Sequence, residues 1–102
     1  MNPFDMNIEA EDLRRERNKA RELRASPWWK RQCAKGRCHY CGRPTPARDL
    51  TMDHIVPIAR GGRTTRGNVA PCCKDCNNRK KGMLPMEWEA FLETVRKNGD
   101  FR

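Results

Sequence analysis

This 102-residue sequence lacks any long apolar run and has little material for a hydrophobic core. Hydrophobic residues make up 36% of the chain, so burial of apolar surface alone leaves little surplus over the entropy cost of folding. No apolar stretch approaches the length of a membrane-spanning helix, and no charged-then-apolar segment precedes a cleavage site. We therefore expect one small cytoplasmic domain with no membrane partner, which needs a further source of stability.

Acidic residues are also scarce relative to basic ones. The chain has 13 Asp and Glu against 22 Lys and Arg, a formal net charge of +9. Basic residues run through most of the sequence, and such a charge balance favours a polyanionic partner such as nucleic acid.

Six cysteines can supply the missing stability. The lack of a secretion signal and the CxxC spacings favour a metal site over three disulfides. Two such pairs form a tetrahedral site for a structural Zn²⁺, since thiolates are soft ligands that suit zinc: Cys38, Cys41, Cys73 and Cys76. Cys72 competes with Cys73 as the partner of Cys76, and we expect Cys72 and Cys33 to be spare thiols. Four thiolates leave no vacancy for His39, which we do not assign as a ligand.

Helix signals flank a middle segment rich in Cys, Gly and Pro. We divide the single domain into a basic helical extension packed on the core, the core itself, and a C-terminal docking helix with its tail: 1–36, 37–84 and 85–102. Apolar residues three and four apart predict helices, and Ser, Pro and Gly mark where the helices start or end. The predicted helices run over 8–25, over 27–35 and from Pro85 to a stop at Gly99. The middle predicts a strand, a Gly-rich basic loop and a short helix: 50–58, 59–68 and 75–81.

Four segments of the middle resemble the HNH nucleases, in the same order and with both CxxC pairs: CHYCG, DHIVPIARGG, GNVAPCC and CNNRKKG. The resemblance runs from Cys38 to Gly82. The motif of that family is a hairpin and a helix that grip one divalent ion. It implies an α+β fold, with a small zinc-stapled ββα-metal core that is treble-clef-like and has flanking N- and C-terminal helices.

The same resemblance implies a role for four residues. His54 matches the general base of the family, and Asn68 matches the asparagine that orients that imidazole. Asp53 is expected to give a carboxylate to the catalytic ion. The last residue of the motif, usually a histidine ligand, is here Asn77, and whether Asn77 binds the ion directly stays open.

The ligand chemistry at Asn77 favours a particular metal. Its carbonyl oxygen is a hard ligand, whereas imidazole favours zinc, cobalt or nickel, so we expect Mg²⁺ or Mn²⁺ as the catalytic ion. Neighbouring side chains on a regular strand point to opposite faces. Either the strand therefore ends near Asp53, or Asp53 and His54 reach the ion and the phosphate from opposite sides.

Basic residues around these motifs are expected to contact the DNA backbone without reading its sequence: Arg60, Arg63, Arg66, Arg79, Lys80 and Lys81. The hypothesis is a metal-dependent DNA endonuclease with one active site per chain, which as a monomer nicks duplex DNA. One alternative is a zinc-knuckle module that binds nucleic acid without cleaving it, because Asn77 fails to hold the ion. Another is a nuclease that acts on RNA.

Overall fold

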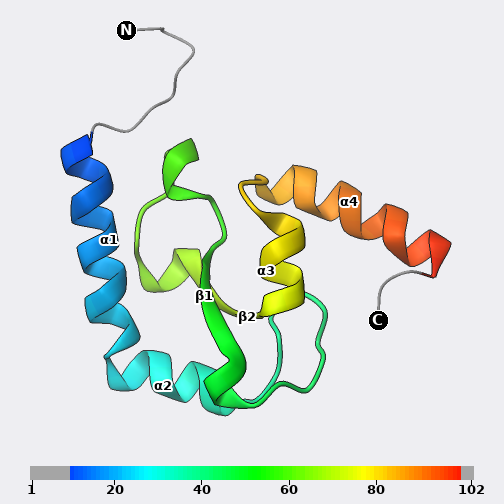
Figure 1. Cartoon of the computed structure of the whole chain (residues 1–102), viewed down its shortest axis with the longest axis horizontal. Coiled ribbons are helices and arrows are strands. Elements are labelled where there is room, and N and C mark those ends of the chain that lie inside the picture. Colours follow the sequence, from blue (N-terminus) through cyan, green and yellow to red (C-terminus); the bar gives the residue numbers. More distant parts are fainter. Residues whose placement is uncertain (1–9, 100–102) are drawn as a thin grey trace, which may run out of the picture.

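A two-stranded antiparallel hairpin lies at the centre of the protein, with two helices on either side of it (Figure 1). We analysed a computed structural model, which describes residues 10–99. The described chain runs through α1 (Ala10–Arg24), α2 (Pro27–Ala34), β1 (Leu50–His54), β2 (Val69–Cys73), α3 (Lys74–Lys80) and α4 (Pro85–Asn98). The fold is therefore α+β, as predicted. Within residues 10–99, every helix is too short or too polar to cross a bilayer.

The two N-terminal helices begin and end close to their predicted limits. Helix α1 starts at Ala10, so the predicted start at residue 8 lies outside the described residues. Ser26 caps α2, because its side-chain oxygen accepts a hydrogen bond from the Trp29 amide at 3.2 Å, and Pro27 occupies the first turn. The chain then turns at Gly36, whose φ of 70° is a left-handed value that suits glycine.

Strand β1 is shorter than the predicted strand over 50–58. Its pairing with β2 ends at the pair His54 and Val69. Pro57 then precedes a 3₁₀ turn, η2 (Ile58–Arg60), because proline has no amide hydrogen with which to continue a ladder. The connection back to β2 includes a second turn, η3 (Arg66–Asn68). The strand prediction was therefore wrong beyond His54, and the Asp53–His54 pair lies where the strand ends.

Each face of the hairpin is covered by a different apolar cluster. On one face, Leu50 and Val69 pack with Trp29 and Cys33 of α2. On the other face, the metal-site cysteines and Cys72 pack with the buried side of α4, which comprises Trp88, Leu92 and Val95. Helix α4 ends at Gly99 with a left-handed φ of 71°, as its sequence predicts.

Candidate functional site

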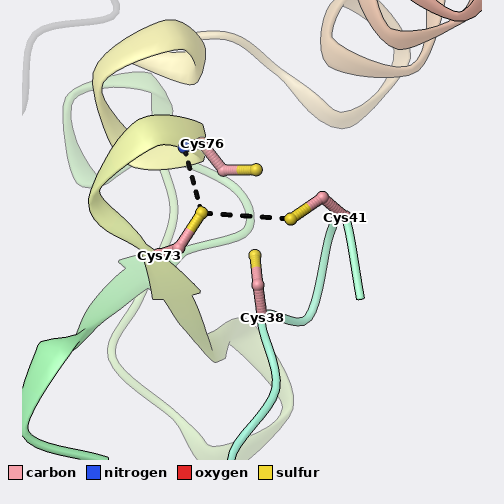
Figure 2. Close-up of side chains that lie close together, drawn as sticks. All are labelled: Cys38, Cys41, Cys73 and Cys76. Carbon is pink, nitrogen blue, oxygen red and sulfur yellow. Dashed lines mark hydrogen bonds between the residues drawn. The ribbon is translucent and has the colours of Figure 1, made fainter. Parts of the chain in front are cut away.

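Four cysteine sulfurs converge between the loop before β1 and the junction of β2 with α3 (Figure 2). All four Sγ atoms lie within 4.8 Å of one another, and the Cys41 and Cys73 sulfurs are 3.9 Å apart. Backbone amides point at two of the sulfurs: Tyr40 N donates to Cys38 Sγ, and Cys76 N donates to Cys73 Sγ, each at 3.4 Å. These donors stabilise thiolates, the form that binds metal. Cys38, Cys41, Cys73 and Cys76 thus form a candidate metal site.

Cys72 lies beside this cluster and is not one of its four members. Its side chain is fully buried, and its thiol donates to the carbonyl oxygen of Cys73 at 3.2 Å. The neighbouring side chains of Cys72 and Cys76 lower the pKa of Cys38 below its ordinary value. Cys33 sits in the other apolar cluster, and burial raises the pKa of its thiol.

His54 ends β1, where the alternation of the strand places it on the same face as Leu50 and Met52, which pack against α2. Its Nε2 atom lies 2.9 Å from the hydroxyl oxygen of Thr64. Burial lowers the pKa of the imidazole, although the carboxylates of Asp53 and Glu16 oppose that effect. A lowered pKa keeps the ring neutral near pH 7, the state that a general base requires.

The family resemblance implied that Asn68 orients the His54 imidazole, but the hydrogen bonds of its side chain go elsewhere. Its side-chain oxygen accepts from Val56 N at 2.9 Å, and its side-chain nitrogen donates to Val56 O at 3.0 Å and Arg63 O at 2.8 Å. All three hydrogen bonds go to backbone atoms of the loop between the strands, so Asn68 shapes that loop. Thr64 makes the contact with His54 instead.

Asp53 points to the hairpin face opposite His54 and is 7% exposed. Its Oδ2 atom accepts from the Tyr40 hydroxyl at 2.5 Å and pairs with Lys80 Nζ at 3.1 Å. The Lys80 ammonium also donates to the carbonyl oxygens of His54 and Ile55. Burial raises the pKa of Tyr40, and its hydrogen bond to Asp53 raises it further, so the phenol stays protonated.

Lys80 corrects a sequence prediction, because its side chain is fully buried and cannot contact DNA. Helix α3 places it one turn after Asn77, so both face the hairpin. A buried ammonium needs a partner, and Asp53 with two backbone carbonyls provides one.

Asn77 also faces the strand that carries Asp53. Its side-chain nitrogen donates to Thr51 Oγ1 at 2.8 Å, and Thr51 and Asp53 are two residues apart on β1 and share a face. Since the nitrogen is the atom that donates, the carbonyl oxygen of Asn77 is available to another partner. A carboxylate and an amide oxygen on adjoining elements form a donor set that fits a hard divalent cation.

The remaining basic residues proposed for DNA contact lie on the loop between the strands and at the end of α3. The three loop arginines are exposed, and each has a neighbour: Arg60 pairs with Glu87, Arg63 with Glu16, and Arg66 lies over the Trp28 ring. Lys81 is exposed at the end of α3, while Arg79 is half-buried.

Two residues that contact the site escaped the sequence reasoning. Thr64 was treated only as part of a Gly-rich basic loop, and Glu16 only as part of the basic helical extension packed on the core. Yet Glu16 is 1% exposed, and its Oε1 atom accepts from the Thr64 amide at 2.7 Å. Their separation of 48 residues explains why no local pattern could reveal the pair.

Comparison with known proteins agrees with this arrangement. A family model described as HNH endonuclease matches residues 38–90. The CRISPR-associated endonuclease Cas9 of Corynebacterium diphtheriae is 47% identical over 49 residues. This match covers 47% of the present chain and 4% of that much longer protein.

Proposed function

Since the chain belongs to the HNH endonuclease family, whose model spans just over half of it, we propose that it is a metal-dependent endonuclease that hydrolyses DNA phosphodiester bonds. The observation that carries the proposal is the end of β1, where His54, whose pKa burial lowers, lies next to Asp53 on the opposite face. A base and a carboxylate ligand for a cation are the two groups that phosphodiester hydrolysis needs from the protein.

In this proposal His54 accepts a proton from a water molecule. The water oxygen attacks phosphorus and forms a new P–O bond, while the bond to the 3′ oxygen breaks and that oxygen leaves with the electron pair. A neutral imidazole can act as base from about pH 6.5 upward even without a shift, and its lowered pKa extends this range downward.

Asp53 and Asn77 are the proposed ligands of the catalytic ion, for which Mg²⁺ or Mn²⁺ suits their oxygen atoms. The ion would neutralise phosphate charge and stabilise the leaving oxygen. Tyr40 and Lys80 hold the Asp53 carboxylate in place from the protein side. If Asn77 is a ligand, Asn77→His should shift the preferred metal from Mg²⁺ or Mn²⁺ toward nickel or zinc.

The four-thiolate site is proposed to hold a structural Zn²⁺, since closed Cys₄ sites are typical of zinc. Exposed basic side chains of the loop and of Lys81 would contact the phosphate backbone, without readout of bases. DNA binding should therefore weaken steeply as salt concentration rises, and a flat response would contradict this mode of binding.

A plasmid-nicking assay tests the proposal. Supercoiled DNA is incubated with the protein and Mg²⁺ or Mn²⁺, using wild type, His54→Ala and His39→Ala. His39 is the matched control, because it is the other of the two histidines and its side chain is exposed. We expect nicked circles from wild type and His39→Ala, and none from His54→Ala.

Other outcomes select other functions. Wild-type protein that retards the plasmid without cutting it would favour a catalytically inactive nucleic-acid-binding module. The pairing of Asp53 with Lys80 is the observation that gives this alternative weight, because it already neutralises the carboxylate. Cleavage of an RNA substrate in place of DNA would reassign the substrate. Clean double-strand breaks would indicate a dimer or two successive cuts by one monomer, whereas we propose a monomer that nicks.

A further inference from the structure

A chain of hydrogen bonds connects helix α1 to the His54 imidazole. The Thr64 hydroxyl donates to the backbone carbonyl oxygen of Glu16 at 3.1 Å, and the same hydroxyl oxygen lies 2.9 Å from His54 Nε2. The Thr64 amide donates to the Glu16 carboxylate at 2.7 Å. Glu16 thus holds Thr64 at two points, and Thr64 holds the ring.

The direction of these hydrogen bonds determines the protonation of the ring. A hydroxyl group carries one proton, and a carbonyl oxygen can only accept. A Thr64 hydroxyl that donates to the Glu16 carbonyl has no proton left for the ring, so its oxygen accepts from the imidazole and Nε2 of His54 then carries the hydrogen. In a neutral ring the other nitrogen, Nδ1, then has the free electron pair.

The Glu16 side chain is buried in the protein, unlike most charged side chains. It is 1% exposed, and its Oε2 atom pairs with Lys19 at 3.3 Å and Arg63 at 3.4 Å. Burial acts to raise the pKa of Glu16, but the Thr64 amide and Lys19 outweigh it and the net pKa is lowered. The carboxylate is therefore a charged, fixed acceptor beside the loop.

We propose that Glu16 and Thr64 are positioning residues that hold His54 as its Nε2–H tautomer and so present Nδ1 to the attacking water. Glu16 lies outside the segment of 38–90 that matches the family, so the N-terminal helix would complete the active site. The catalytic part of the inference rests on the proposed function, whereas the tautomer is a property of the protein alone.

The tautomer is measured by ¹⁵N NMR of the imidazole nitrogens in the zinc-loaded 102-residue chain, at one pH at which the ring is neutral. Wild type should show the Nε2–H form. Thr64→Val removes the hydroxyl at nearly constant volume and should give a mixture, while Thr64→Ser should restore the wild-type form. Thr65→Val is the matched control, because Thr65 is the exposed neighbour in the same loop.

Cleavage is measured at saturating DNA in a single turnover, with the DNA dissociation constant determined separately. We expect Thr64→Val to lower the rate constant about 10- to 100-fold with binding unchanged, as for other residues that orient an active-site ligand. Glu16→Ala should slow cleavage in the same way, and Glu16→Gln should recover most of the rate, since its amide oxygen still accepts from the Thr64 amide. Glu22→Ala, an exposed charge on the same helix, is the control.

Retention of the Nε2–H form and of the wild-type rate by Thr64→Val would overturn the inference. So would a loss of rate in Thr64→Val that Thr64→Ser fails to recover in a folded protein. If wild type cuts no nucleic acid while the tautomer still depends on Thr64, the proposed function fails and the positioning role stands.

Discussion

Gly62 shows how closely the loop between the strands folds back on the residues that follow β1. A Cβ atom at this position would lie 1.8 Å from Val56 O and 2.9 Å from Pro57 O, and no real structure tolerates such contacts. Gly62 also donates its amide hydrogen to Pro57 O at 2.9 Å. Only glycine allows the backbone to fold back here, and this turn delivers Arg63 and Thr64 to their positions.

We therefore expect Gly62→Ala to lower the free energy of unfolding by roughly 1–3 kcal/mol, because the backbone must shift to relieve the overlap. Gly67→Ala is the matched control. A Cβ atom there would meet no described atom within 4 Å, so the change should stay within about 0.5 kcal/mol. Urea denaturation of both variants measures the difference, and equal stability of the two would show that the loop has another conformation.

The ion pair of Lys80 and Asp53 yields a second prediction at this scale. Their side chains are 0% and 8% exposed, so removal of one partner leaves a buried, uncompensated charge. Lys80→Met should cost about 3–5 kcal/mol of unfolding free energy. Lys81→Met, which changes an exposed neighbour, should have little effect.

Thermal or urea denaturation without added Mg²⁺ or Mn²⁺ checks this pair of variants. In a double-mutant cycle, Asp53→Asn should offset part of the loss in Lys80→Met, since the buried charge is then gone. Independent, additive losses would show that the two residues are not coupled.

The residues that were predicted from the sequence belong to short local patterns, whereas the residues that were missed interact with partners far away in the sequence. The CxxC pairs Cys38 with Cys41 and Cys73 with Cys76 are local spacings, and the described cysteines converge as expected. Thr64 and Glu16 meet across 48 residues, which no local pattern encodes. Lys80 was misjudged because its charge suggested DNA, although its spacing of three from Asn77 already placed it on the inner side of α3.

At the scale of elements, Trp88 is the largest of the buried side chains through which α4 packs on the rest of the protein. Trp88 is 2% exposed, stacks on Phe91 with ring centroids 5.5 Å apart, and contacts Tyr40 edge-on at 5.5 Å. Its indole Nε1 has no hydrogen-bond partner among the described residues. The tryptophan therefore stabilises the docking of α4 through packing of its rings.

We expect Trp88→Ala to cost about 3–5 kcal/mol of unfolding free energy. Trp88→Phe keeps one aromatic ring, so it leaves a smaller cavity than alanine and loses a donor that has no partner among the described residues, and it should cost clearly less. Calorimetry or denaturant titration of both variants measures the gap. A phenylalanine variant as unstable as the alanine variant would mean that the indole nitrogen has a partner after all.

Helices were easier to predict than strands for a physical reason. Helix limits depend on caps within a few residues, such as Ser26 before α2 and Gly99 after α4. Strand β1 ends at His54, which pairs with Val69, the first residue of β2, so the apolar residues after His54 were misread as a continuation. Strand β2 even contains Pro71, which a two-stranded sheet tolerates because both of its strands are edges.

At the scale of the whole molecule, the thiolate site joins two distant parts of the chain and should control folding. Structural zinc sites supply roughly 10–16 kcal/mol of apparent binding energy, which matches or exceeds the stability of a typical small domain. Removal of the metal with a chelator should therefore unfold at least the hairpin and α3. Near-UV circular dichroism, which reports on Tyr40 and Trp88 beside the site, should collapse; an unchanged spectrum would contradict this prediction.

Adjacent cysteines provide the control for the metal ligands. Cys73→Ala should abolish the binding of one metal ion per chain, whereas Cys72→Ala should retain it, because Cys72 is not one of the four converging thiols. Metal content after gel filtration gives the stoichiometry. Loss of metal from the Cys72 variant alone would reverse the assignment.

The back-to-back placement of Asp53 and His54 constrains the path of a substrate. A nucleic-acid strand lying along either face of the hairpin would meet only one of the two side chains, since each face is covered by different helices. Both can act on one phosphate only where β1 stops and the chain turns away. If both residues act on one phosphate, as proposed, the cleaved strand crosses the hairpin at the end of β1, where the chain turns into the loop over 55–68.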